Sequence, residues 1–134
     1  MRDFVYDSGV RIFYGAGQLP AVAAELAKLG KRLLIVPTAS FLSGGHYEAL
    51  ERSLTAAGLQ VFPMSAGKQP LLSKVQEGVW LCAEKQIDAV LGIGGGDSMD
   101  LAKAIAFGAR NADVPMEKFL TYEVSTSSRP MLPV

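Results

Sequence analysis

The sequence has little of several residue types, and each shortage removes a class of protein from consideration. Its single cysteine, Cys82, cannot form a disulfide framework within the chain. The 13 basic and 13 acidic residues cancel, and no basic cluster or tail offers a surface for nucleic acid. No apolar run approaches the roughly 18 residues that cross a bilayer, and the N-terminus lacks the apolar core of a signal peptide. We therefore expect a cytoplasmic protein that binds neither membrane nor nucleic acid.

The chain of 134 residues is 49% hydrophobic, which is enough to build one domain with a buried core. Apolar runs suited to buried strands alternate with amphipathic stretches suited to helices. This alternation predicts an α/β fold, a Rossmann-like parallel sheet with helices on both faces. We expect strands at residues 11–14, 33–36, 59–64 and 89–93, and helices at 19–29, 47–57, 71–85, 98–109 and 116–120.

Two glycines follow expected helices. Gly30 and Gly58 stand where a helix commonly ends in a left-handed residue, a conformation that glycine adopts without strain. Within the third helix, Trp80 and Cys82 are expected to face the core, the cysteine as a small buried hydrophobe.

The alternation weakens beyond residue 109. The final residues, RPMLPV at 129–134, are apolar enough to suggest that a further strand begins there. We therefore expect this chain to be the N-terminal part of a longer protein, and a flexible natural tail is the alternative.

The segment IDAVLGIGGGDSMDLAKAIA, residues 87–106, is the most informative part of the chain. Its apolar run ends in Gly94, Gly95 and Gly96, and an amphipathic helix opens immediately afterwards. The start of a helix presents unpaired backbone N–H groups and the positive end of the helix dipole, and glycines let an anion approach closely. The segment therefore predicts a cradle for phosphate.

Two familiar phosphate-binding motifs do not fit this turn. A Rossmann G-x-G-x-x-G counted from Gly92 fails at its third glycine, which is Asp97 here, and no Gly-Lys-Ser/Thr follows as a P-loop requires. A purely structural turn is the alternative to binding. Three consecutive glycines cost conformational entropy that a simple strand-to-helix connection avoids, so binding is the favoured interpretation.

The run GGGDSMDLAK, residues 94–103, resembles the GGGSxxDxAK signature of the iron-containing (group III) alcohol dehydrogenases. Weaker matches at residues 13–17, 33–38, 69–78 and 130–134 lie in the family's order. The resemblance implies a two-domain dehydrogenase, with an α/β dinucleotide-binding domain followed by an all-helical domain that holds a divalent metal. Residues 1–134 would be the first of these domains, and the second would lie outside the chain.

The same resemblance implies roles for individual residues. The backbone from Gly95 to Ser98 would hold the pyrophosphate, Asp100 would lie near the nicotinamide, and Gln69 would line the cofactor cleft. Thr38 stands in place of an aspartate that binds the adenosine ribose. The complete set of expected cofactor-binding residues is Thr38, Gln69, Gly94, Gly95, Gly96, Asp97, Ser98 and Asp100.

Two of these positions depart from the family pattern. The missing carboxylate at Thr38 would bind ribose hydroxyls and repel a 2′-phosphate, so both NAD and NADP remain open as cofactors. Asp97 replaces a serine, and a carboxylate about 4 Å from a phosphate costs roughly 4 kcal/mol at an effective dielectric of 20 before screening. We therefore expect the Asp97 side chain to turn back onto the N–H of Met99 or Asp100 and to leave only its backbone for phosphate.

The metal site that the resemblance implies consists of one aspartate and three histidines, all on the helical domain. This chain has one histidine, His46, which we expect at the surface or at a helix start. Iron, or another divalent ion such as zinc, would therefore be bound by residues outside the chain. Asp100 and Lys103 are expected to form an ordinary surface pair, and no catalytic residue is assigned.

The resemblance implies an intact enzyme that interconverts an alcohol with its aldehyde or ketone by means of NAD or NADP. Its partners would be that small substrate, the missing helical domain and a second copy of the enzyme. The chain alone is expected to bind nucleotide with little or no turnover. Two alternatives stay open: a relative of glycerol dehydrogenase or dehydroquinate synthase, and a nucleotide-binding module without chemistry.

Overall fold

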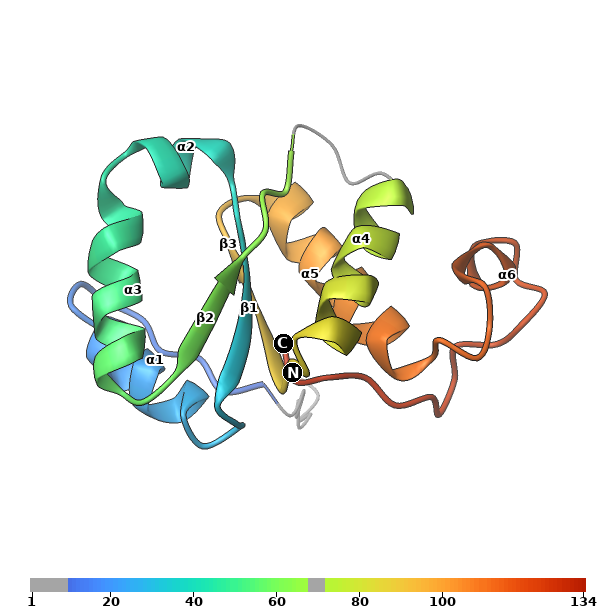
Figure 1. The fold of residues 1–134 in the computed structure, drawn as a ribbon, viewed down its shortest axis with the longest axis horizontal. Helices are drawn as coiled ribbons and strands as arrows, with labels where there is room; N and C mark the ends of the chain where they lie inside the picture. Colours follow the sequence, from blue (N-terminus) through green and yellow to red (C-terminus); the bar gives the residue numbers. More distant parts are fainter. Residues whose placement is uncertain (1–9, 68–71) are drawn as a thin grey trace, which may run out of the picture.

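The computed structural model describes residues 10–67 and 72–134, which form a parallel sheet between two layers of helices (Figure 1). The sheet has the order β2-β1-β3, and both of its strand pairs are parallel. The α/β class predicted from the sequence is therefore confirmed. The elements in chain order are α1 (Leu19–Leu26), β1 (Arg32–Pro37), α2 (Ala39–Ser43), α3 (His46–Ala56), β2 (Gln60–Pro63), α4 (Leu72–Glu84), β3 (Ala89–Ile93), α5 (Gly96–Arg110) and α6 (Met116–Leu120).

The central strand β1 is covered on both faces. Leu33 and Ile35 pack into the layer formed with α1 and α3, whereas Leu34 and Val36 pack against α4 and α5. None of these four side chains is more than 1% exposed. A strand buried on both sides is an uninterrupted apolar run, which is the pattern from which the sequence predicted it.

The two crossover connections between the strands run in opposite directions across the sheet. It reaches β2 through α2 and α3, then crosses back past β1 to β3 through α4 (Figure 1). Parallel crossovers are right-handed, so two that run in opposite directions place their helices on opposite faces of the sheet. This is the doubly wound arrangement. The loops after the neighbouring strands β1 and β3 therefore lead to helices on opposite faces of the sheet.

The helices α4 and α5 lie close together because glycines stand at their contact. A Cβ atom on Gly78 would lie 2.3 Å from Cδ1 of Ile105, and one on Gly108 would lie 2.6 Å from Cγ2 of Val79. Cys82 in the same layer is 5% exposed, and burial raises the pKa of its thiol to about 11. Its expected role as a small core residue is confirmed.

The expectation for Trp80 was wrong. Its side chain is 61% exposed, whereas Val75, Gly78 and Cys82 on the same helix are buried. A helix turns about 100° per residue, so a position two residues before Cys82 lies on the opposite side of α4.

Gly30 does not cap a helix, because α1 ends at Leu26 and the chain then turns toward Asp88. The Asp88 carboxylate accepts the backbone N–H groups of Lys31 at 2.7 Å and Arg32 at 2.9 Å. A Cβ atom on Gly30 would lie 2.2 Å from Cβ of Asp88, so this glycine provides room for the contact. Gly58, with φ of +86°, does follow α3 in the left-handed conformation expected of it.

The strand predicted at residues 11–14 is absent from the sheet that the structure describes. Ile12 is 81% exposed and Tyr14 is 94% exposed, so the apolar side chains have no buried face to occupy. A strand needs a neighbouring backbone and a face to bury, and the apolar alternation of four residues supplies neither.

The end of the chain lies alongside the other edge of β3 without forming a strand of its own. The N–H of Val90 donates to the carbonyl of Pro133 at 2.9 Å, and the N–H of Leu132 donates to that of Ala106 at 3.0 Å. Leu132 is 3% exposed and belongs to the core between β3 and α5. The apolar residues in this segment thus serve packing.

We expect Asp88→Ala to lower the free energy of unfolding by about 1–2 kcal/mol near neutral pH, because two backbone N–H groups lose an ionised acceptor. The hydrogen bonds from Lys31 and Arg32 hold the pKa of Asp88 below its ordinary 3.8. The carboxylate therefore stabilises the fold fully above the ordinary pKa of 3.8, and this stabilisation is lost as the pH falls through the lowered pKa of the folded protein.

Chemical denaturation of both proteins at about pH 7 and about pH 2.5 measures this difference. Asp113→Ala is a matched control, because this exposed carboxylate meets Arg129 only at 3.5 Å. A deficit of Asp88→Ala that is as large in acid as at neutral pH would contradict the role of the carboxylate.

Candidate functional site

The carboxyl ends of the three strands lie at one edge of the sheet, where β1 and β3 are neighbours. The loops that follow these two strands lead to α2 on one face and to α5 on the other (Figure 1). In open α/β sheets, ligands bind in the crevice at such a switch point. The candidate site is therefore built from the loops that begin at Thr38 and Gly94.

These two loops are in direct contact. The N–H of Thr38 donates to the carbonyl of Ile93 at 3.0 Å. A Cβ atom on Gly94 would lie 2.3 Å from Cγ2 of Thr38, and the φ of Gly94 is +128°, in a region that other residues rarely adopt. The first glycine of the run is thus required for both space and conformation, and Thr38 lies beside it.

The helix α5 begins directly after this contact. Gly95 is its N-cap residue in an extended conformation, and Gly96 is its first helical residue. Both glycines are exposed, and a Cβ atom on either would have no neighbour within 4 Å. The N–H groups of Gly96, Asp97 and Ser98 precede that of Met99, the first to donate within the helix, so they have no helical acceptor and suit an anion. We call these two open glycines and the three N–H groups the cradle.

Ser98 fixes the cradle to the sheet. Its side chain is fully buried, and its hydroxyl donates to the carbonyl of Val36 on β1. The side chain of Ser98 is therefore not available to a ligand. Behind it, Gly92 lets the helix approach β3, because a Cβ atom there would lie 3.0 Å from Cβ of Ala102.

The predicted side-chain hydrogen bond of Asp97 was wrong. Helix α5 starts two residues earlier than a cap at Asp97 requires, and the N–H of Met99 donates to the carbonyl of Gly95 at 3.2 Å. The next N–H, that of Asp100, meets the carbonyl of Gly96 in the regular helical pattern. The Asp97 carboxylate is exposed and has no hydrogen bond or ion pair with any residue that the structure describes.

The other predicted cofactor residues differ in what the structure says of them. Oδ1 of Asp100 lies 3.5 Å from Nζ of Lys103, and the two side chains are 71% and 61% exposed, which confirms the expected surface pair. Asp100 lies one turn further along α5 than the cradle. Gln69 falls outside the described residues.

Two hollows in the structure were not anticipated from the sequence. An apolar pocket of about 380 Å³ lies beside the cradle on the face that α1 and α3 cover. Residues on four elements that are distant in sequence form it, so no local pattern could reveal it. Its lining residues are Leu19, Val22, Phe41, His46, Ala49, Leu50, Leu91 and Ile93.

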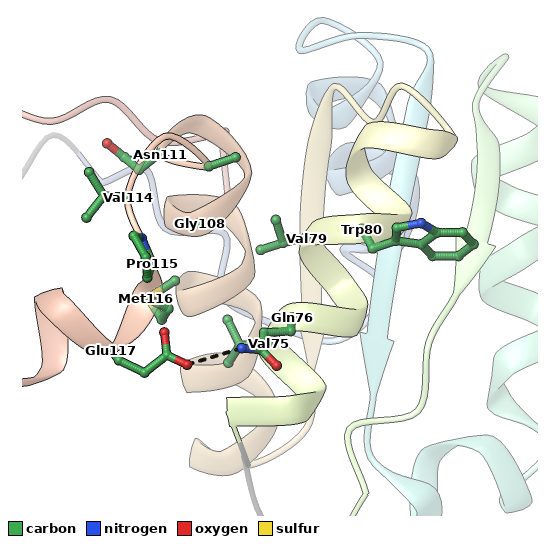
Figure 2. Close-up of a pocket in the computed structure, with 11 residues that line it drawn as sticks. Val75, Gln76, Val79, Trp80, Gly108, Asn111, Val114, Pro115, Met116 and Glu117 are labelled. Carbon is green, nitrogen blue, oxygen red and sulfur yellow. Dashed lines mark hydrogen bonds between the residues drawn. The ribbon is translucent and has the colours of Figure 1, made fainter.

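The second hollow, of about 430 Å³, lies between α4, the end of α5 and α6 (Figure 2). Nε2 of Gln76 donates to Oε1 of Glu117 at 3.3 Å across it. Gly108 and Asn111 mark the far end of α5 from the cradle, and a helix of this length extends about 22 Å. This hollow is therefore separate from the candidate site.

No group of three histidine, cysteine, aspartate or glutamate side chains able to hold a metal ion occurs among the described residues. His46 is exposed at the start of α3, where the sequence analysis placed it. The side chains present therefore do not fit an iron site, and no step through a metal follows from them. Among the described helices, none is long and apolar enough to cross a membrane.

Comparison with known proteins agrees with this arrangement. The model of the iron-containing alcohol dehydrogenase family matches residues 9–134. Over 112 residues the chain is 34% identical to probable NADH-dependent butanol dehydrogenase 1 of Bacillus subtilis (strain 168), covering 82% of this chain and 29% of that protein. Over 124 residues it is 34% identical to NAD-dependent methanol dehydrogenase of Bacillus methanolicus, covering 90% and 31%.

The fold matches solved structures of the same kind. NADH-dependent butanol dehydrogenase A from Thermotoga maritima superimposes with a TM-score of 0.86 and 29% identity, over 99% of this chain and 33% of that one. The chain spans about 30% of the length of the curated relatives named above. Because the family model covers nearly the whole chain, the resemblance found in the sequence is confirmed, and the chain belongs to the iron-containing alcohol dehydrogenase family.

Proposed function

We propose that this chain is the nucleotide-binding part of an NAD-dependent alcohol dehydrogenase, an enzyme that interconverts an alcohol with its aldehyde or ketone. The observation that carries the proposal is the exposed, unobstructed cradle at the switch point of the sheet, next to Thr38. The relatives named above are NAD- or NADH-dependent dehydrogenases that act on butanol and methanol. Their names support both the cofactor and a small alcohol as the substrate.

The chain's own residues would hold the cofactor in a definite order. The N–H groups of Gly96, Asp97 and Ser98 would bind the pyrophosphate, with the dipole of α5 behind them. Thr38 lies on the β1 side of that position, so its hydroxyl would face the adenosine ribose. A hydroxyl does not repel a 2′-phosphate as a carboxylate would, so we propose NAD as the cofactor with NADP tolerated.

When bound, NAD accepts a hydride from the alcohol or, as NADH, returns one to the carbonyl compound. Asp100 and Gln69 would lie toward the nicotinamide and along the cofactor cleft, and residues 1–134 as a whole would act as the dinucleotide-binding domain. The iron, or another divalent ion such as zinc, and the groups that contact the alcohol would come from a helical domain outside the chain. The part described here would therefore bind and orient the cofactor without completing turnover.

We also propose that the enzyme works in the cytoplasm, because the one cysteine of this chain is a free, buried thiol that suits a reducing compartment. Exposed apolar side chains such as Ile12, Trp80 and Leu120 would provide surface for the helical domain or for a second copy of the enzyme.

Gly95→Val tests the cradle directly. The Cβ position of residue 95 has no neighbour within 4 Å and its backbone is extended, so the fold accommodates the larger side chain. We expect the substitution to weaken NAD binding at least about ten-fold, since the side chain occupies the approach of the pyrophosphate. Titration calorimetry with NAD gives the dissociation constants.

The matched control is Ala21→Val, an exposed position on α1 away from the cradle. It should leave the affinity for NAD unchanged, and both variants should keep the thermal midpoint of the wild type. Equal affinity of Gly95→Val and the wild type for NAD would contradict the proposed site.

A second test concerns turnover. The chain mixed with NAD and 1-butanol should produce no sustained NADH absorbance, because no metal-binding group occurs among its described residues. Adding a chelator should leave NAD binding unchanged for the same reason. Steady NADH production that the chelator abolishes would show that the chain itself carries a functional metal centre, contrary to the proposal.

A further inference from the structure

The cradle has an unusual charge for an anion site. Asp97, the second residue of α5, has an exposed carboxylate. No cation forms an ion pair with it in the described part of the chain. The lysines nearest this edge on α4 and α5 are already in ion pairs. Lys103 on α5 meets Asp100 at 3.5 Å, and Lys74 on α4 meets Glu77 at 2.7 Å.

Among the described residues, backbone N–H groups and the helix dipole are therefore what is available to hold an anion here, against the negative charge of Asp97. The repulsion between Asp97 and a ligand grows in proportion to the charge of the ligand. A pyrophosphate between two ribose groups is a diester with a charge of about −2, whereas a terminal phosphate that carries no ester adds charge because its second proton is largely lost at neutral pH. ADP and ATP thus bring about −3 and about −4.

We propose that Asp97 is a specificity-determining residue. It makes the cradle selective for the diester pyrophosphate of a dinucleotide over mononucleotides such as ADP and ATP, which end in a phosphate without an ester. The inference rests on the function proposed above and deepens it. Such selectivity would matter to an NAD-binding site because ATP and ADP share the adenosine and phosphate groups by which NAD is recognised.

The position of Asp97 explains how one residue can both permit and restrict binding. Its N–H belongs to the cradle, and its exposed carboxylate, free of hydrogen bonds to described residues, is carried by the same residue. Acidic side chains in a first helical turn also favour the helix itself through the dipole. The carboxylate therefore suits the fold while it opposes the ligand, and only a comparison between ligands separates the two effects.

The experiment compares the wild type with Asp97→Asn, a variant of the same size without the charge. Dissociation constants for NAD, ADP and ATP are measured by titration calorimetry at low ionic strength without divalent cations. We expect the substitution to raise affinity about five-fold for NAD, about ten-fold for ADP and about twenty-fold for ATP, because the repulsive energy scales with ligand charge. Added salt should reduce all three gains through screening.

Glu84→Gln is the matched control, since it removes an exposed carboxylate that already has a lysine partner, at the end of α4 and outside the proposed site. Its effects should be small and should not grow from NAD to ATP. Thermal melts of each variant without ligand monitor any change in the start of α5.

The outcomes separate the inference from the proposed function. Equal gains for the three ligands, or the largest gain for NAD, would overturn the role of Asp97 in selectivity while leaving a working NAD site. Tighter binding of ATP to the wild type than to Asp97→Asn on addition of magnesium would also overturn it, because the carboxylate would then recruit charge. If neither the wild type nor either variant binds NAD, the proposed function itself is contradicted.

Discussion

Gly94 and Thr38 lie so close that a Cβ atom on the glycine would fall 2.3 Å from the threonine methyl group, and the site depends on this contact. It joins the ends of two neighbouring strands whose helices lie on opposite faces of the sheet. A residue with a side chain at position 94 would be excluded by the threonine and strained by the φ of +128°. The turn can therefore place the start of α5 beside β1 only because glycine stands there.

The remaining contacts hold that helix start in place while leaving it open. The buried hydroxyl of Ser98 donates to β1, and Gly92 allows α5 to lie directly on β3. At Gly95 and Gly96, two of the three glycines, an added Cβ atom would have no neighbour within 4 Å. The arrangement thus has a rigid base formed by packing and a free surface formed by backbone, which suits an anion that must approach N–H groups closely.

Much of this could be predicted from the sequence because the signals were local. The uninterrupted apolar runs identified β1 and β3, and the three glycines before an amphipathic segment identified the cradle. The errors arose where distant residues decide the outcome. Gly30 makes room for Asp88, which is 58 positions away, and the strand expected at residues 11–14 has no face to bury. Trp80 was assigned to the core side of its helix together with Cys82, although its position on α4 turns it outward.

The Asp97 expectation failed for a subtler reason. The sequence pattern suggested that the aspartate would cap the helix, but the extended conformation of Gly95 lets the helix begin before it. The backbone then satisfies the N–H groups that the side chain was expected to meet, and the carboxylate stays exposed. A shift of two residues in the helix start thus converts an expected structural cap into an exposed charge in the first turn of α5.

The central claim is that the cradle binds the pyrophosphate of NAD through backbone N–H groups. Amide chemical shifts of the isotope-labelled chain, followed by NMR during a titration with NAD, test it most directly. The account predicts that the amides of Gly96, Asp97 and Ser98 show the largest changes, with Thr38 close behind. Saturation with NAD that moves amides elsewhere, such as those around the hollow between α4 and α6, while these four remain unchanged would contradict it.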